Sequence, residues 1–204
     1  MVPTRKNKFM KSILCLIAAV TLFAATAVMA APSLVVSVPD QTLAMIDGGV
    51  VVEKFAVSTS RFGLGDSPNS YATPLGSLEI ASKIGANAPL GAVFKSRRPT
   101  GEILKPNAAG RDPIVTRILW LRGLERGNAR AYTRGIYIHG TPVEQLIGRP
   151  ASFGCIRMRS RDIARLFSEV RVGTRIEVAN TRLGSAVAKA KLDSQIRSTR
   201  LAAN

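Results

Sequence analysis

Both the fold and the chemistry of this chain are indicated by one segment, Ile136-Tyr137-Ile138-His139-Gly140-Thr141-Pro142, and by Ala151-Ser152-Phe153-Gly154-Cys155-Ile156-Arg157-Met158, which follows it. Side chains alternate between the two faces of a strand, so Ile136 and Ile138 would enter the core while Tyr137 and His139 face the other way. His139 would then lie at the strand end, where its side chain can reach a cleft. Gly140 allows a backbone or a substrate to approach closely.

The second half of this segment contains a cysteine that could act as a nucleophile. A thiol attacks a carbonyl group well only as the thiolate, and a neighbouring imidazole can take its proton. His139 is the only histidine of the chain and precedes Cys155 by sixteen residues. It is therefore the sole candidate base for this thiol. These residues alone leave a buried, inert cysteine open as the alternative.

The residues beside Cys155 favour a catalytic turn. Gly154 permits a tight turn, and backbone N–H groups there could face a developing oxyanion. The hydroxyl group of Ser152 could orient the imidazole or the substrate. Arg157 lies on the same side as Cys155 if the segment is extended. Its guanidinium could lower the pKa of the thiol or bind a substrate carboxylate through two hydrogen bonds.

The composition excludes several classes of protein. The chain has 204 residues, of which 46% are hydrophobic and 21% charged, as expected of a packed domain rather than a disordered basic tail. One histidine and two cysteines cannot supply a zinc site of the usual Cys/His type. Two cysteines cannot form a disulfide framework either. We expect no metal site.

Residues 1–30 have the pattern of a secretory signal peptide. Four basic residues without an acidic one precede an uncharged apolar run, 13–29, that ends in Val28-Met29-Ala30. Cleavage after Ala30 would lower the net charge from +16 to +12 and would remove Cys15. Cys155 would then be an unpaired thiol in a disulfide-forming compartment, which favours a functional role. The alternative is an uncleaved anchor helix.

Most of the remaining chain has the pattern of β-structure. The Asp47-Gly48-Gly49 turn between two apolar runs predicts a hairpin within residues 33–58. Residues 60–75 predict a long loop of the kind that is usually functional or disordered. Trp120 lies in a continuous apolar run and is expected in the core. Further strands are expected at residues 76–84, near Val93, and at 114–121, 135–139 and 174–178.

One helix is clear from the sequence. Apolar residues recur at the helical spacing i, i+3, i+4 and i+7 in Ile163, Leu166, Phe167 and Val170. Ser160 can cap this helix, and Asp162 lies in its first turn. Residues 142–147 could form one further helical turn. Residues 181–204 are basic and rich in alanine, and we expect a mobile or loosely helical tail. The fold class predicted is mainly β, a sandwich or barrel-like domain with one clear helix.

The paired motif resembles the signature of the L,D-transpeptidase catalytic domain family. That signature is His-Gly, roughly fifteen residues, and then Ser/Thr-X-Gly-Cys-hydrophobic-Arg/Asn. This chain has His139-Gly140-Thr141 and Ser152-Phe153-Gly154-Cys155-Ile156-Arg157. Residues 57–59, 73–76, 148–150 and 172–174 resemble other blocks of the family, so the resemblance covers about residues 33–179. Many members have a second histidine where this chain has Phe153.

The resemblance implies a β-sandwich of mixed sheets over residues 31–180 with a catalytic cleft. It implies that Cys155 attacks the carbonyl at the L-centre of diaminopimelate in a peptidoglycan tetrapeptide stem, and that D-Ala leaves. The side-chain amine of a second stem then resolves the acyl-enzyme into a 3→3 cross-link. His139 would accept and donate the proton, with Ser152 and Gly154 completing the catalytic set. No cofactor is needed, because exchange of peptide bonds conserves bond energy.

The resemblance also implies substrate contacts and partners. Substrate-binding residues are expected among Arg157, Gly140, Thr141, Tyr137 and Phe153. The expected partners are peptidoglycan stem peptides, or an outer-membrane lipoprotein as acceptor, and the protein is expected to be a carbapenem-sensitive monomer in the periplasm or cell envelope. The basic surface fits anionic wall material, whereas nucleic acid is not expected, since no nucleic-acid motif is visible.

Other functions stay open at this point. An L,D-carboxypeptidase or a cross-link hydrolase would use the same thiol and would differ only in acceptor access. A sortase or a papain-like wall peptidase is disfavoured, because sortases place their histidine and arginine much further from the cysteine. A non-enzymatic, basic cell-wall-binding module would not need Cys155.

Overall fold

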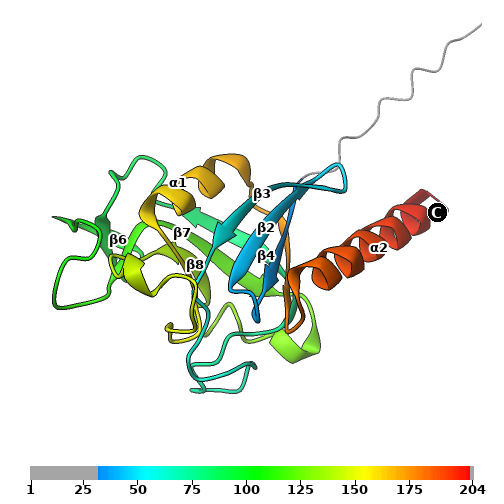
Figure 1. Cartoon of the computed structure of the whole chain (residues 1–204), viewed down its shortest axis with the longest axis horizontal. Helices are drawn as coiled ribbons and strands as arrows, with labels where there is room; N and C mark the ends of the chain where they lie inside the picture. The colour runs from blue at the N-terminus through cyan, green and yellow to red at the C-terminus, as the bar shows by residue number, and fades with distance from the viewer. Residues whose placement is uncertain (1–31, 203–204) are drawn as a thin grey trace, which may run out of the picture.

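A long mixed sheet forms the frame of the protein in this computed structural model, which describes residues 32–202 (Figure 1). The expected signal peptide, residues 1–30, lies outside the described residues. The strands run in the order β3-β2-β1-β10-β4-β7-β5-β6, with β8 paired to β7 and β9 paired to β8. The elements are β1 (Ser33–Ser37), β2 (Thr42–Asp47), β3 (Val50–Ala56), β4 (Gly76–Ile84), β5 (Ala92–Lys95), β6 (Arg98–Ile103), β7 (Ile114–Gly123), β8 (Tyr137–Gly140), β9 (Ile156–Met158) and β10 (Arg175–Ala179), with the 3-10 turns η1 (Arg126–Asn128) and η2 (Glu144–Leu146) and the helices α1 (Ser160–Glu169) and α2 (Leu183–Ala202).

The predicted mainly β fold with a mixed sheet is confirmed. β1 pairs in parallel with β10, and β8 with β9, while the other pairings are antiparallel. The predicted hairpin is the β2–β3 pair. Gly48 and Gly49 at its turn have φ angles of 53° and 77°, which a two-residue turn with both central residues at positive φ requires and glycine allows. The predicted turn within 142–147 is η2.

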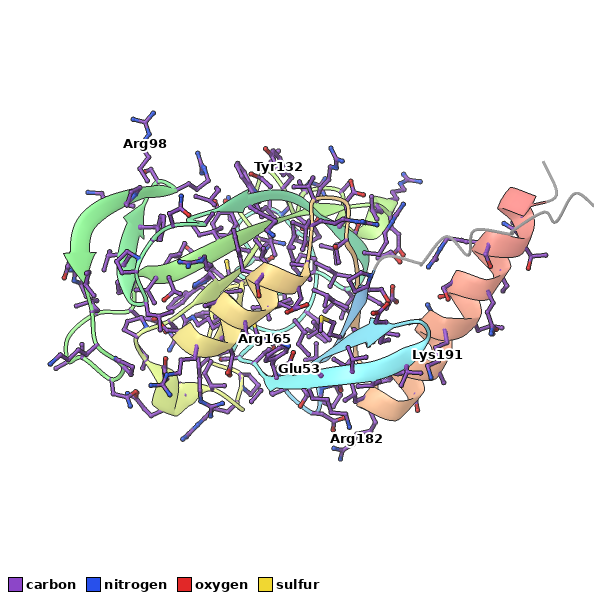
Figure 2. All side chains as sticks on the ribbon, turned by 90° about the horizontal axis from the view of Figure 1, so that it is seen from above. Glu53, Arg98, Tyr132, Arg165, Arg182 and Lys191 are labelled. Atoms are coloured by element: carbon purple, nitrogen blue, oxygen red, sulfur yellow. The ribbon has the colours of Figure 1, made fainter. Side chains whose placement is uncertain are left out.

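The main core lies between the sheet and α1, which crosses it in Figure 1. The helical stripe predicted from the sequence faces this core, with Ile163 and Leu166 fully buried. At the edge of the helix, Arg165 forms an ion pair with Glu53 of β3 at 3.4 Å (Figure 2). The predicted cap is wrong: the N-cap residue is Arg159, and the backbone N–H of Ser160 donates to Glu144 Oε1 at 2.8 Å. The cap therefore comes from η2 rather than from the helix itself.

A second helix, α2, occupies the segment expected to be a mobile or loosely helical tail. Its first turns pack on β1 and β2 through Ala186 and Val187, and its far end projects beyond the sheet (Figure 1). Asp40, far away in sequence, accepts the Leu183 N–H at 2.7 Å and pairs with Arg182 (labelled in Figure 2). No local sequence signal reports a cap supplied from so far away, which is why a packed helix was not predicted. Whether its end is mobile stays a prediction.

Candidate active site

The β8–β9 pair places the motif residues on one face of the sheet. In the parallel register His139 lies beside Arg157, and Ile138 beside Ile156. Paired residues in neighbouring strands point to the same side. Ile138 and Ile156 enter the main core, so His139 and Arg157 face away from it, as the strand pattern predicted.

Cys155 lies immediately before β9 on this same polar side. The backbone N–H of Tyr137 donates to Cys155 Sγ at 3.4 Å, and the thiol donates to the carbonyl oxygen of Gly135 at 3.5 Å. Burial raises the pKa of the Cys155 thiol to about 11, against the opposing effects of the Tyr137 N–H and of the charges of Arg157 and Arg134. The resting cysteine is therefore a protonated thiol at neutral pH.

The imidazole of His139 is held in one tautomer. The ring is buried, and its Nδ1 lies 2.8 Å from the carbonyl oxygen of Gly140. A carbonyl oxygen only accepts, so Nδ1 carries the proton and Nε2 keeps its lone pair. Burial lowers the pKa of His139 to about 4. The imidazole is thus neutral and can accept a proton.

The register also brings His139 within reach of Cys155. The two residues are diagonal neighbours on adjacent parallel strands. With strands about 4.8 Å apart and a rise of about 3.3 Å per residue, their Cα atoms are roughly 8 Å apart. The contacts of Cys155 Sγ in this structure are with the Tyr137 N–H and the Gly135 carbonyl oxygen, so proton transfer to His139 belongs to the proposed function. The resting pair is a neutral thiol and a neutral imidazole, not an ion pair.

The turn before Cys155 depends on a glycine. Gly154 has a φ of 112°, and a Cβ there would lie 3.2 Å from the carbonyl oxygen of Ala72. Thr73 Oγ1 donates to the carbonyl oxygen of Gly154 at 3.0 Å. The loop expected at residues 60–75 is therefore packed against the cysteine turn.

Ser152 stabilises this turn. Its hydroxyl donates to the carbonyl oxygen of Cys155 at 2.5 Å and accepts the N–H of Gly154 at 3.2 Å. The hydroxyl therefore has backbone partners, not the imidazole that the sequence interpretation considered. The Gly154 N–H already donates to Ser152 in this structure. Stabilisation of an oxyanion by the backbone N–H groups of the turn therefore stays a prediction.

Arg157 is bound by an acid that the sequence analysis did not single out. Its Nη1 lies 2.6 Å from Asp112 Oδ2, and it donates to the carbonyl oxygen of Ala151 at 3.2 Å. Thr141 Oγ1 donates to Asp112 Oδ1 at 2.5 Å. Thr141 and Arg157 are thus joined through one carboxylate. The only sequence signal for Asp112 was an acid placed just before Pro113 and a buried strand.

Gly140 and Tyr137 have structural contacts of their own. A Cβ on Gly140 would lie 2.6 Å from the carbonyl oxygen of Val115, so the close approach at this glycine is by the β7 backbone. Tyr137 is buried, and its hydroxyl accepts a hydrogen bond from Arg97 at 3.3 Å. Its ring packs edge-on against Trp120 at 5.7 Å between centroids.

Trp120 itself lies outside the main core. Its ring stacks on Tyr132 (labelled in Figure 2) at 4.1 Å between centroids, with the Arg97 guanidinium 4.6 Å from its centroid. Trp120 is half-buried and packs against a smaller hydrophobic cluster that contains Phe94, Ile118 and Tyr137, so the expectation of a core tryptophan is met only in part. Adjacent positions of β7 alternate between the two faces, and Trp120 falls on the face opposite to Leu119 and Leu121.

Phe153 forms part of the wall beside the cysteine and not of the core. Its side chain is 50% exposed and packs on Phe62 and Tyr71, with ring centroids 5.2 and 5.9 Å away. Arg61 lies 4.6 Å from its ring centroid. This aromatic cluster borders a pocket of about 420 Å³ that Gly135 and Ile136 also line.

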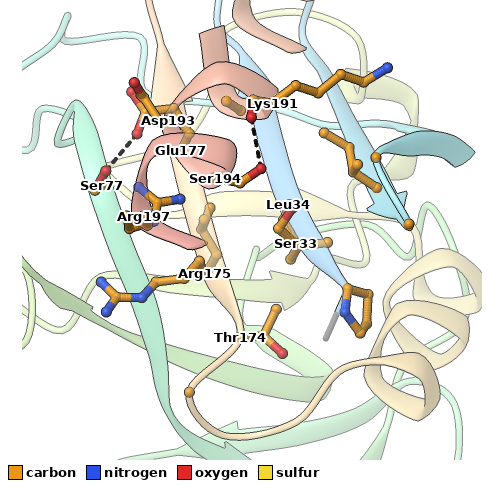
Figure 3. Close-up of a pocket in the computed structure, with 17 residues that line it drawn as sticks. Ser33, Leu34, Ser77, Thr174, Arg175, Glu177, Lys191, Asp193, Ser194 and Arg197 are labelled. Carbon is orange, nitrogen blue, oxygen red and sulfur yellow. Dashed lines mark hydrogen bonds between the residues drawn. The ribbon is translucent and has the colours of Figure 1, made fainter. Parts of the chain in front are cut away.

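A second pocket, of about 210 Å³, lies between α2 and the ends of β1, β4 and β10 (Figure 3). Figure 3 shows polar and charged side chains around it, among them Glu177, Asp193 and Arg197. Neither Cys155 nor His139 lines it. Within the described residues, no group of three potential metal ligands lies together. Of the motif residues, Ile136 and Phe153 line the pocket of about 420 Å³, while Cys155 and His139 line neither of the two pockets. The candidate site is therefore placed at the β8–β9 pair and the pocket beside Phe153.

Comparison with known proteins assigns the family. Residues 31–178 match the family model of the L,D-transpeptidase catalytic domain (YkuD). The chain therefore belongs to the L,D-transpeptidase catalytic domain family. The matched region includes every motif residue described above.

Individual relatives are similar over parts of their length. A 48-residue stretch is 48% identical to the probable L,D-transpeptidase YcfS of Escherichia coli (strain K12), covering 23% of this chain and 15% of that protein. The L,D-transpeptidase of Xylanimonas cellulosilytica is 17% identical with a TM-score of 0.48, over 73% of this chain and 60% of that one. LdtMt1, solved in complex with imipenem, is 26% identical with a TM-score of 0.45, over 73% and 59%. The chain thus spans less than two thirds of the length of each relative.

Proposed function

We propose that this protein is an exported L,D-transpeptidase that forms 3→3 peptidoglycan cross-links through an acyl-enzyme on Cys155. The observation that carries the proposal is the β8–β9 register, which pairs the only histidine with Arg157, two residues after Cys155. The Cys155 thiol in turn contacts Gly135, which lines the pocket of about 420 Å³. The family supports peptidoglycan stem peptides as substrates. The signal-like residues 1–30 support export to the periplasm or cell envelope.

The neutral pair suits acyl transfer in two balanced steps. Sγ of Cys155 attacks the carbonyl carbon of the donor stem while Nε2 of His139 takes the thiol proton. The C–N bond to D-Ala then breaks, the leaving amine takes that proton, and a thioester remains. The amine of a second stem attacks the thioester, His139 takes its proton, and the released thiolate recovers it. The His139–Gly140 hydrogen bond keeps Nε2 available throughout.

The finer parts of the proposal concern partners. The protein is proposed to act on stem peptides as a monomer. An amine of a lipoprotein is proposed as an alternative acceptor that competes with the second stem. Sensitivity to carbapenems is proposed because LdtMt1 was solved in complex with imipenem.

Muropeptide turnover tests the proposal. The purified protein and Cys155→Ala would be incubated with disaccharide-tetrapeptides, and the products identified by mass spectrometry. We expect 3→3 dimers and free D-Ala from the wild type and neither from the variant. Tripeptides without dimers would indicate a carboxypeptidase, and loss of pre-formed dimers a hydrolase. No turnover, with salt-sensitive binding to sacculi that survives Cys155→Ala, would indicate a binding module.

A further inference from the structure

The pocket beside Phe153 has a basic wall that the mechanism above does not use. It lies next to the cysteine turn, since Gly135 and Ile136 line it and Gly135 accepts from the Cys155 thiol at 3.5 Å. Arg130 and Arg134 line its other side. A pocket that combines aromatic side chains with cationic ones beside a nucleophile suits an anionic part of the substrate.

One of the two arginines is already occupied. Arg134 forms an ion pair with Asp66 at 2.7 Å and donates to the carbonyl oxygen of Ala72 at 2.8 Å. Its side chain is only 12% exposed. Arg134 therefore holds the 60–75 loop against the cysteine turn and has little capacity left for a ligand.

Arg130 differs from Arg134 in what it contacts. Its backbone N–H donates to Asp66 Oδ2 at 2.6 Å, which fixes its position. The residue is exposed, and its guanidinium takes part in none of the ion pairs formed among residues 32–202. Arg130 is thus a cation at the pocket that can pair with a ligand.

The arginine that the sequence suggested for this role is less suitable. Arg157 is buried and paired with Asp112 at 2.6 Å. Binding a substrate carboxylate there would require breaking that pair, which would leave the Asp112 carboxylate without its partner. The substrate carboxylate is better served by a guanidinium that has no partner yet.

We infer that this pocket receives the terminal carboxylate of the donor stem, with the guanidinium of Arg130 as its receptor. The inference rests on the proposed function. In a donor stem, the carbon of this carboxylate is separated from the attacked carbonyl carbon by one N–Cα unit, or roughly 4 Å. A carbonyl held at Sγ therefore brings the terminal carboxylate into the space next to the cysteine turn. Arginine binds carboxylates through two parallel hydrogen bonds, which fixes orientation as well as affinity.

A matched pair of substrates tests this inference. One is a disaccharide-tetrapeptide with a free terminal carboxylate, and the other is the same molecule with a terminal carboxamide. Release of D-Ala or D-Ala amide would be followed by mass spectrometry for the wild type, Arg130→Ala and Arg126→Ala. Arg126 is an exposed arginine in η1 that does not line the pocket, so this control removes the same charge.

We expect kcat/KM of the wild type to be about 10- to 100-fold higher for the free acid than for the amide. This is the usual effect of losing a charge-assisted pair of hydrogen bonds, which the amide cannot form with Arg130. Arg130→Ala should lose most of that preference, because turnover of the acid should fall much more than turnover of the amide. Arg126→Ala should keep the preference. Turnover of the amide also shows that each variant is folded.

Several results would overturn the inference. Equal rates for acid and amide in the wild type would do so, as would equal loss of both substrates in Arg130→Ala. A preference that disappears in Arg61→Ala instead would place the carboxylate on the other side of Phe153, where Arg61 lies. Absence of any turnover in the wild type would contradict the proposed function itself, so the two failures are distinguishable.

Discussion

The two faces of the β8–β9 pair share one backbone, but only one of them carries the side chains of the proposed chemistry. One face carries Ile138, Ile156 and Met158, all fully buried in the main core. The other carries His139 and Arg157 beside the buried ring of Tyr137, with Cys155 just before β9 packed against the same small hydrophobic cluster. A slip of one residue would exchange the two faces, because side chains alternate. Apolar packing on one face therefore fixes the positions of the chemical groups on the other.

The largest expected effect comes from removing the base on the polar face. In His139→Asn, the shorter amide can still donate to the Gly140 carbonyl oxygen that now accepts from Nδ1, but no nitrogen lone pair replaces Nε2. We expect kcat/KM for tetrapeptide donors to fall roughly 10²- to 10⁴-fold, the usual contribution of a general base. Near wild-type turnover in a variant with an unchanged thermal transition would show that His139 is not the base.

A smaller effect is expected from a cavity on the core face. Ile138→Ala removes buried methyl groups from a fully buried position, which should lower the free energy of unfolding by about 2–5 kcal/mol in urea denaturation. The folded variant should keep its reactive thiol, because the polar face is unaltered. Val52→Ala is the matched control on exposed β3, with an expected change within about 0.5 kcal/mol. Equal losses in the two variants would contradict the division into a core face and a polar face.

The smallest expected effect is the dependence of stability on pH. The pKa of His139 is lowered from 6.5 to about 4 in the folded protein. Between these values the unfolded chain binds the proton more readily, so the stabilisation present above pH 6.5 is lost as pH falls through 4. The loss amounts to roughly 3 kcal/mol. As pH is lowered from 6.5 to 4, the free energy of unfolding should fall more steeply for the wild type than for His139→Asn. Parallel curves of unfolding free energy against pH for the two proteins would exclude a buried neutral histidine.

Much of this arrangement could be predicted from the sequence, because local patterns determine it. The period-2 alternation of Ile136 to His139 correctly assigned the two faces. The Asp47-Gly48-Gly49 turn and the helical stripe through Ile163 and Leu166 were also local signals, and the structure confirms both. The scarcity of histidine and cysteine singled out His139 and Cys155.

The contacts that sequence reasoning missed join residues far apart in the chain. Asp112 pairs with Arg157, Asp66 with Arg134, and Asp40 caps α2. Each partner is an ordinary charged residue, and its neighbours in sequence do not indicate which residue it will pair with. Long-range pairing of this kind is set by the assembled sheet, so it could not be read from spacing or periodicity.

The most direct test of the central claim is intact-mass analysis after imipenem treatment. The full, reduced chain would be compared with Cys155→Ala and with Cys15→Ser, the matched control that removes the other cysteine. We predict a mass increase of one imipenem on the wild type and on Cys15→Ser, and none on Cys155→Ala. Folded wild-type protein without an adduct, or an adduct that persists in Cys155→Ala, would contradict the assignment of Cys155 as the nucleophile.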